Sequence, residues 1–572
     1  MLSADIQKLP RHFLPQGFQL NTWADVAPYF EALEKRELVT VADLEQWLKD
    51  LSELEAAISE DACWRQIKMT CDTTDAALEA SFNYFCTEIQ PHIQPYADRL
   101  NKKLMATPLV SELPQEQYYT YLRSVKKSID LFREANIPLQ SELSVLQQQF
   151  GAIAGKMTVE VNGQEYTLQQ AAKFLESHDR SLREQVYHKI WERRLADKEA
   201  LNNLYTTLVQ KRQQVAANAG FDNYRDYKFV ELGRFDYTKE HCFQFHEAVR
   251  QHVLPLVNNI YERKAKALGL TKLKPWDTEA YPEGVQPLKP FNSGAELLEK
   301  TIACFEQLHP FFADCLRKMN SLGHLDLESR KGKAPGGYNC PLAESGAPFI
   351  FMNAAGTMDD VTTMVHEGGH AVHSFLAHNL PLSAFKEYPM EIAEVASMAM
   401  ELFSMDHWQA FFGNDTEKLK QAKEHQLERV ITIFPWIATI DAFQHWVYEH
   451  PNHTEEERAA AWTSILDTFK IDAIDTSDVE VYRRYSWQRQ LHLFEVPFYY
   501  IEYGIAQLGA IGLWMQYKQN PKQALQNYIN ALQLGGTKTL PALYEAAGLK
   551  FDFSPEHIKT LMQFVKAEMD AL

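Results

Sequence analysis

The chain has 572 residues, of which 45% are hydrophobic and 23% are charged, and its formal net charge is −19. This balance excludes a mostly disordered chain, and the length is enough for a large core or several packed subdomains. We expect neither nucleic acid nor a membrane as a partner, because both bind clusters of Lys and Arg and this acidic chain carries only scattered basic pairs.

We expect no targeting or membrane-anchoring segment. The first residues lack the continuous apolar stretch of a secretory signal. No stretch approaches the roughly 18 uninterrupted apolar residues of a transmembrane helix, since Pro435 interrupts the best candidate, residues 430–440. The seven cysteines are widely spaced and form no CxxC pair, which is typical of reduced thiols. The sequence therefore predicts a cytoplasmic protein and leaves its oligomeric state open.

Helical periodicity covers most of the chain, in segments rich in Glu, Lys, Gln, Ala and Leu. The Pro-rich connection 272–292 is the most loop-like region. We predict a mainly α protein with a soft division between residues 1–190 and residues 191–572. The clearest helical segments are residues 41–58, 115–134, 181–217 and 239–268.

Strand signals are few. Residues 157–168 alternate apolar and polar side chains around Asn162-Gly163, which predicts a hairpin with Val159 and Val161 facing Tyr166 and Leu168. A second strand is expected at residues 348–353 (PFIFMN), after the glycine-bearing loop 332–346. We therefore expect a small β-sheet near residue 350.

The segment His366-Glu367-Gly368-Gly369-His370 is an HExxH motif. Residues four apart lie on one helix face, so the two imidazoles can reach one zinc ion. Glu367 points away from that ion but can reach a water bound to it, which is the general-base position of a zinc hydrolase. Apolar neighbours predict that this helix is buried.

Two consecutive glycines inside the motif helix, Gly368 and Gly369, each cost about 1 kcal/mol relative to Ala. A helix tolerates that cost where another backbone or a substrate approaches closely. Asp359 and Asp360, near the expected helix start, are suited to capping and to the helix dipole.

A catalytic zinc site needs a third protein ligand, and candidates follow in KEYPMEIAEVASMAMEL. Glu394, flanked by apolar residues, is the preferred ligand, because a buried carboxylate needs a cation or hydrogen-bond donors. Glu401 lies on the same face two turns later and is suited to accept a hydrogen bond from a ligand histidine. Glu391 is more readily a solvated residue, and His373 is an alternative ligand. The small residues around Glu394 predict close packing on the motif helix.

A second cluster lies far downstream, between Arg483 and Tyr503. It holds His492, Tyr499, Tyr500 and Tyr503, whose N–H and O–H groups can stabilise the oxyanion of peptide hydrolysis. The alternative is an aromatic core helix without a catalytic role.

These segments resemble the M3 family of zinc metallopeptidases. The motif segment and those after it are most similar to the oligoendopeptidase F branch, and thimet oligopeptidase is a more distant relative. The resemblance is specific from about residue 336 to 510 and rests upstream on length and helical character. It is carried by GGYN at 336–339, PFIFMN at 348–353, DDVTTMVHEGGHAVHSF at 359–375, EIAEVASMAMEL at 391–402 and HLFEVPFYYIEYGIAQLG at 492–509.

The resemblance implies a nearly all-α fold of two helical lobes around a deep channel, with one zinc ion on the channel floor. Residues 1–190 would be an N-terminal region of oligoendopeptidase F type and residues 191–572 the catalytic region. Short unstructured peptides would be the substrates. The small sheet would lie next to the HExxH helix, and PFIFMN would be its edge strand and would pair with the substrate backbone, which explains broad sequence tolerance.

The resemblance also implies roles for single residues. His366, His370 and Glu394 would hold the zinc, Glu367 would be the general base, and Glu401 would support a ligand. The histidine and tyrosines that contact the substrate carbonyl would be His492, Tyr500 and Tyr503, with Tyr499 as a substitute for Tyr500. The other substrate-binding residues would be Gly336, Gly337, Tyr338, Phe349 and Phe351.

We therefore predict a zinc endopeptidase of short peptides, in which Glu367 takes a proton from the attacking water. The nearest alternative is a carboxypeptidase or dipeptidyl carboxypeptidase of the same chemistry, for which Arg483, Arg484 or Arg489 could bind the substrate C-terminus. A remote alternative is a non-catalytic peptide-binding protein, which leaves the water-activating Glu367 without a purpose.

Overall fold

The structure is a computed structural model, and it describes every residue except 1, 7, 9 and 331. Helices dominate it, and the described residues form only one two-stranded and one three-stranded sheet. The mainly α fold predicted from the sequence is confirmed. Within the described part of the chain, no helix is long and apolar enough to cross a membrane.

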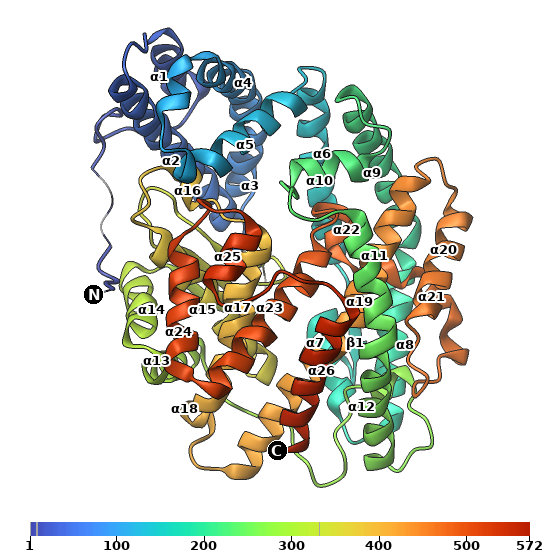
Figure 1. Ribbon diagram of the computed structural model, residues 1–572. Helices are drawn as coiled ribbons and strands as arrows, with labels where there is room; N and C mark the ends of the chain where they lie inside the picture. Colours follow the sequence, from blue (N-terminus) through green and yellow to red (C-terminus); the bar gives the residue numbers. More distant parts are fainter. Residues whose placement is uncertain (1, 7, 9, 331) are drawn as a thin grey trace.

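The first helices pack around a separate apolar core at the end of the molecule drawn in blue in Figure 1, and Leu382 and Phe385 from the C-terminal half also belong to this core. Trp47 and Leu54 are fully buried in this core. The long second helix begins at Val41 and is capped by Thr40, whose hydroxyl accepts from the Asp43 N–H while the Asp43 carboxylate accepts from the Thr40 N–H. These helices are α1 (Trp23–Lys35), α2 (Val41–Cys71), α3 (Ala76–Tyr84), α4 (Gln90–Ala106) and α5 (Gln115–Leu131).

The next helices along the chain contribute to a second, larger core. Apart from Ala4 and Ile6, the buried residues of this core begin at Leu131. The single helix expected over residues 181–217 is interrupted at Asp197. The helix expected over residues 239–268 contains a π turn before Pro255, because proline has no N–H to donate to the helix. A division near residue 190 stays a prediction. The helices are α6 (Asn136–Ala154), α7 (Leu168–Ala172), α8 (Arg180–Ala196), α9 (Lys198–Asn218), α10 (Tyr224–Glu231), α11 (Lys239–Ala248) and α12 (Leu254–Ala267).

The predicted hairpin is β1 (Thr158–Val161) and β2 (Gln164–Thr167). Asn162 and Gly163 both have positive φ angles, 54° and 78°, as a two-residue hairpin turn requires. Val159 lies opposite Tyr166, but Val161 lies opposite Gln164 and Leu168 already begins α7, so the predicted register is wrong in part.

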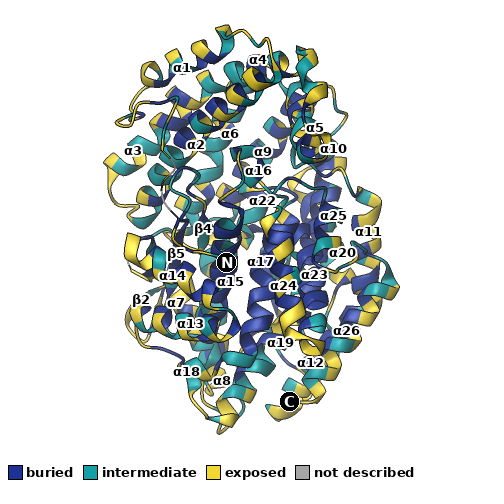
Figure 2. Cartoon of the chain, turned by 60° about the vertical axis from the view of Figure 1, so that its left-hand side comes forward, coloured by how far each residue is buried: buried dark blue, intermediate teal, exposed yellow. Residues whose placement is uncertain are grey.

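The C-terminal half builds the centre of the molecule. Figure 2 shows α15, α17 and α23 as the most continuously buried helices, and α17 packs against both of the others. The helices are α13 (Gly294–Leu308), α14 (Pro310–Leu322), α15 (Met358–Ala377), α16 (Ser383–Lys386), α17 (Met390–Ser404), α18 (Gln409–Phe412), α19 (Thr416–Glu449), α20 (Glu455–Thr468), α21 (Glu480–Tyr485), α22 (Leu491–Glu495), α23 (Tyr500–Gln519), α24 (Pro521–Gln533), α25 (Leu540–Ala546) and α26 (Pro555–Asp570).

The three-stranded sheet lies beside α15 and consists of β3 (Leu325–Glu328), β4 (Tyr338–Cys340) and β5 (Phe349–Ala354). Its order is β3-β5-β4, with β5 parallel to β3 and antiparallel to β4. The expectation that PFIFMN forms an edge strand is therefore wrong. Its continuous apolar run is typical of a strand buried on both faces, and the edge next to it is β4.

Candidate metal and catalytic site

The motif helix α15 begins at Met358 and is capped by Thr357 and Asp360. The Thr357 hydroxyl accepts from the Asp360 N–H, and the Asp360 carboxylate accepts from the N–H groups of Thr357 and Ala355. The acidic pair Asp359 and Asp360 thus lies in the first turn, where negative charge complements the helix dipole. This start places the HExxH residues in the middle of a buried helix.

The paired glycines let two neighbours approach α15 closely, as predicted. A Cβ atom on Gly369 would lie 2.6 Å from Cα of Ser397 and 2.7 Å from the carbonyl oxygen of Ala396, both on α17. A Cβ on Gly368 would lie 2.8 Å from the Phe305 ring of α13. Backbone contact between α15 and α17 carries Glu394 to the two histidines.

His366, His370 and Glu394 point one ligand atom each toward a common point, and these atoms lie within 4.8 Å of one another. Glu394 Oε2 is 3.4 Å from His366 Nε2 and 3.7 Å from His370 Nε2. Two ligand atoms bound about 2.0–2.1 Å from one tetrahedral ion lie about 3.3 Å apart. The three side chains therefore fit a zinc ion with little movement.

Glu401 orients the first histidine. Its Oε1 lies 2.7 Å from His366 Nδ1, and its Oε2 accepts a 2.7 Å hydrogen bond from Gln426 Nε2. An ionised carboxylate only accepts hydrogen bonds, so Glu401 Oε2 accepts from Gln426 and Oε1 accepts from the Nδ1–H of His366. With its proton on Nδ1, His366 has the Nε2 lone pair free for a metal.

Glu367 is a buried carboxylate beside these ligands. Burial raises its pKa to about 7, against the attraction of His366. Its Oε2 has no hydrogen-bond partner among the described residues. Gly337 passes so close that a Cβ there would lie 3.9 Å from Oε1. A carboxylate with a free oxygen and a pKa near neutrality is suited to take a proton from water.

The downstream tyrosines occupy three different positions. The Tyr499 hydroxyl donates a 2.6 Å hydrogen bond to Glu394 Oε1, the oxygen that does not face the histidines. Tyr500 is buried with its ring 4.9 Å from that of His492. Tyr503 is half-buried, and its hydroxyl lies 3.3 Å from His492 Nε2. Phe498, just before them, has a positive φ of 65°, which turns the chain into α23.

A chain of hydrogen bonds fixes the proton of His492. Trp436 Nε1, which can only donate, lies 2.9 Å from Gln490 Oε1. The Gln490 amide nitrogen therefore donates to His492 Nδ1, 2.6 Å away. Burial lowers the pKa of His492 to about 4, so the ring is neutral and carries its single proton on Nε2. His492 thus presents an N–H toward Tyr503.

Other sequence candidates lie elsewhere. Glu391 is buried and accepts a 2.7 Å hydrogen bond from the Tyr237 hydroxyl, so it is not a solvated residue. His373 stacks on Tyr388 with ring centroids 3.5 Å apart and does not join the ligand atoms.

The candidate substrate-binding residues divide into two groups. Gly336, Gly337 and Tyr338 lead into β4, next to Glu367, where the Asn339 side chain donates to the Glu367 carbonyl. Phe349 and Phe351 are buried in an apolar cluster that contains Ile67 of α2. The predicted contact of these two rings with substrate does not fit their position, because β5 is covered on both faces.

A sequence model of Peptidase family M3 matches residues 173–563, which is more than half of the chain, and a model of the Peptidase M3 N-terminal domain matches residues 14–132. The chain belongs to peptidase family M3.

This M3 chain is 24% identical over 393 residues to an oligoendopeptidase F homolog of Borreliella burgdorferi, which covers 66% of the chain and 63% of that relative. It is 24% identical over 408 residues to oligopeptidase PepF of Bacillus subtilis, covering 70% of the chain and 58% of PepF. The chain thus spans less than two thirds of the length of these relatives. The structure of PZ peptidase A with an inhibitor matches with a TM-score of 0.92 at 25% identity, covering 98% of this chain and 99% of that one.

Sequence reasoning missed three residues that support the M3 site: Gln426, Trp436 and Gln490. Gln426 and Trp436 lie on α19, between the motif helix and the tyrosines in the sequence. No spacing rule points to them, because they act only after α19 is packed against the site.

Proposed function

We propose that this chain is a zinc-dependent endopeptidase that hydrolyses short unstructured oligopeptides, with one catalytic zinc per chain. The observation that carries the proposal is the convergence of His366, His370 and Glu394 beside the unpaired carboxylate of Glu367. A purely structural metal site would not need a carboxylate that is free to accept a proton. The family assignment supports a peptide substrate.

The bound zinc would supply Lewis acidity toward a water and a peptide carbonyl. Glu367 takes a proton from the attacking water and later delivers it to the leaving amine. Its raised pKa suits both steps, because a group near neutrality can accept and release a proton. His366, oriented by Glu401, and Glu394, oriented by Tyr499, hold their ligand atoms in place.

Tyr503 and His492 donate hydrogen bonds to the carbonyl oxygen as negative charge develops on it. Burial and the nearby carboxylates of Glu394 and Glu367 raise the pKa of Tyr503 well above its usual value, so its hydroxyl keeps the proton. His492 keeps its proton on Nε2 through Gln490. Both groups are therefore donors throughout the neutral range. Tyr500 supports the two from its buried position.

The strand β4 would bind the substrate backbone. Among the described strands it pairs with β5 alone, and Gly337 and Asn339 lie against Glu367. Main-chain pairing does not read side chains, which favours broad sequence tolerance. Unstructured peptides can pair in this way because their backbone N–H and C=O groups are not already paired in secondary structure.

The carboxypeptidase alternative needs a cation that is free to bind a terminal carboxylate. Arg483 is paired with Asp467 and Glu480, and Arg484 with Glu456. Arg489 lies over the Trp436 ring, 4.3 Å from its centroid. These engagements favour the endopeptidase.

The test is mass spectrometry of two versions of one peptide of about nine residues, with a free and with an amidated C-terminus. We expect the same internal cleavage of both, abolished by a zinc chelator and restored by zinc. Cleavage of the free form alone would select the carboxypeptidase. No chelator-sensitive cleavage of either would contradict the proposed function.

A further inference from the structure

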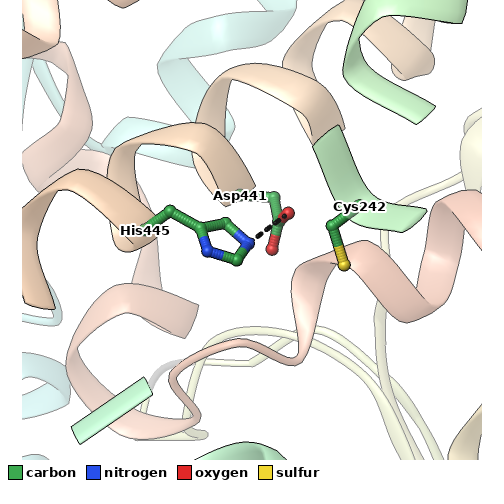
Figure 3. A group of neighbouring side chains, drawn as sticks. All are labelled: Cys242, Asp441 and His445. Carbon is green, nitrogen blue, oxygen red and sulfur yellow. Dashed lines mark ion pairs between the residues drawn. The ribbon is translucent and has the colours of Figure 1, made fainter. Parts of the chain in front are cut away.

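A second group of metal-ligating side chains lies inside the helical core, away from the proposed catalytic residues. It consists of Cys242 on α11 and Asp441 and His445 on α19, and we refer to it as the buried cluster (Figure 3). Each residue offers one ligand atom, and these atoms lie within 4.8 Å of one another. All three side chains are buried.

The buried cluster and its neighbour His246 form two pairs of residues, each with a spacing of four along one helix. Asp441 and His445 lie on one face of α19, and Cys242 and His246 lie on one face of α11. The two helices pack against each other and turn these faces together. Metal sites in helical cores are built in this way, from side chains on facing helices.

The polar atoms of the buried cluster lack the partners that burial demands. Asp441 is 0% exposed, and its Oδ1 has no hydrogen-bond partner among the described residues. The same holds for both ring nitrogens of His445, although Nε2 lies 3.3 Å from Asp441 Oδ2. The ion pairs of Asp441 within the described chain are with histidines, not with Lys or Arg. A buried carboxylate in this state costs free energy unless a cation joins it.

We propose that the buried cluster binds a second divalent transition-metal ion, best matched by zinc, through Cys242 Sγ, Asp441 Oδ1 and His445 Nε2. A mixed sulfur, nitrogen and oxygen set is a zinc ligand set. Binding releases the thiol proton to solvent, and the resulting thiolate and the carboxylate together balance the two positive charges.

His246 supports this site from one turn beyond Cys242. Its Nε2 lies 2.8 Å from Asp441 Oδ2, so it donates to the oxygen that the proposed metal does not use. Hydrogen bonding of a ligating carboxylate by a neighbouring donor is the usual way in which such a ligand is oriented.

The proposed ion has a structural role. A Cys, His and Asp could also form a nucleophilic triad, but Cys242 is buried beneath its neighbours and no substrate can reach its sulfur. The His445 ring lies 5.4 Å from that of Phe498, the residue that directs the chain toward Tyr499. A metal here would tie α11 to α19 behind the segment that carries the catalytic tyrosines.

The test is cobalt substitution of the full-length protein, with Co²⁺ alone as the probe. Of the two metal-ligating groups found among the described residues, the buried cluster contains a cysteine and the group of His366, His370 and Glu394 does not, so a thiolate-to-cobalt charge-transfer band reports the former and not the latter. We expect two cobalt ions per chain and this band in the unaltered protein. A single bound cobalt without the band would overturn the proposal, and this result needs no variant.

Substitutions then assign the band. Cys242→Ser should remove it and lower the bound cobalt from two ions to one, and Asp441→Asn should lower the affinity of the same site. The matched control Cys315→Ser alters another fully buried cysteine and should change neither quantity. His366→Ala should lose the catalytic ion and keep the band, so failure of the proposed function and failure of this inference are distinguishable. Persistence of the band in Cys242→Ser would overturn the assignment.

Discussion

Two regions of this protein each bring three ligand atoms within 4.8 Å of one another, and their surroundings differ. One is the group that we propose to be catalytic, His366, His370 and Glu394, which we call the catalytic cluster, and the other is the buried cluster of Cys242, Asp441 and His445. The side chains of His366 and His370 are 18% and 16% exposed, whereas that of Asp441 is 0% exposed. Convergent ligands are thus not sufficient for hydrolysis, because water and substrate must also reach them.

The side chains next to the two clusters also differ, in polarity and in their capacity to transfer protons. The catalytic cluster adjoins the free carboxylate of Glu367 and the donors of Tyr503 and His492. The buried cluster adjoins aromatic rings, among them Phe243 and Phe498 at 4.8 and 5.4 Å from the His445 ring. We infer that the first environment serves proton transfer and charge stabilisation, whereas the second, into which no substrate can reach, serves to hold an ion in place.

The largest effect should come from removing the base. Glu367→Gln is expected to lower kcat for peptide hydrolysis by about 10²–10⁴-fold, the usual contribution of a general base, without changing metal content. Steady-state kinetics and metal analysis measure the two quantities. Glu417→Gln, at the exposed start of α19, is the matched control and should leave both unchanged. Near-normal hydrolysis by Glu367→Gln would remove this residue from the mechanism.

A pair of tyrosine variants should separate charge stabilisation from ligand support. Tyr503→Phe is expected to lower kcat by about 10²–10³-fold with zinc affinity unchanged, because it removes a donor to the developing oxyanion. Tyr499→Phe removes the hydrogen bond to Glu394 and should lower zinc affinity about 10-fold with a smaller effect on kcat. The opposite assignment of the two effects would show that the tyrosine roles are exchanged.

The support of His366 should be specific to the catalytic cluster. Glu401→Gln is expected to weaken binding of the catalytic zinc by about 10–100-fold in a metal-buffer titration, because an amide cannot accept from both His366 and Gln426. The thiolate-to-cobalt band of the buried cluster should not change. Equal loss at both sites would point to general unfolding instead.

The smallest expected effect tests the proton of His492. In the unaltered protein the pKa of about 4 keeps this ring neutral above that pH, and Gln490 holds the proton on Nε2, so no pH dependence arises from it near neutrality. In Gln490→Glu the carboxylate raises the pKa of His492 and draws the neutral proton to Nδ1. Activity should then fall as pH rises through the new pKa, by about 10-fold for one lost hydrogen bond. Gln490→Met, which adds no charge, should show a loss without this slope, and a flat profile for Gln490→Glu would contradict the assignment.

The sequence predicted the mainly α fold and the tight approach of α15 and α17 because both follow from local pattern: helical periodicity, paired glycines and the small residues near Glu394. It did not predict the sheet order. An apolar strand such as 348–353 has the same sequence pattern whether it is central or at an edge. Its central position follows from its pairing with β3, which precedes it in the chain.

The same limit applies to the sites. HExxH predicted its own ligands because both lie on one helix. The buried cluster was not predicted, since Cys242 and Asp441 are separated by about 200 residues and become neighbours only when α11 packs on α19. Gln426 and Gln490 carry no signature at all, because a buried amide acquires its role from the partners it meets in the fold.

The proposed mechanism requires that His366, His370 and Glu394 hold the catalytic metal. The most direct measurement is anomalous diffraction from crystals of the zinc-loaded protein, above and below the zinc absorption edge. We predict an anomalous peak about 2.0–2.2 Å from the Nε2 atoms of His366 and His370 and from a Glu394 carboxylate oxygen. Absence of this peak from fully active crystals, or a peak bound by His373 instead, would contradict the account.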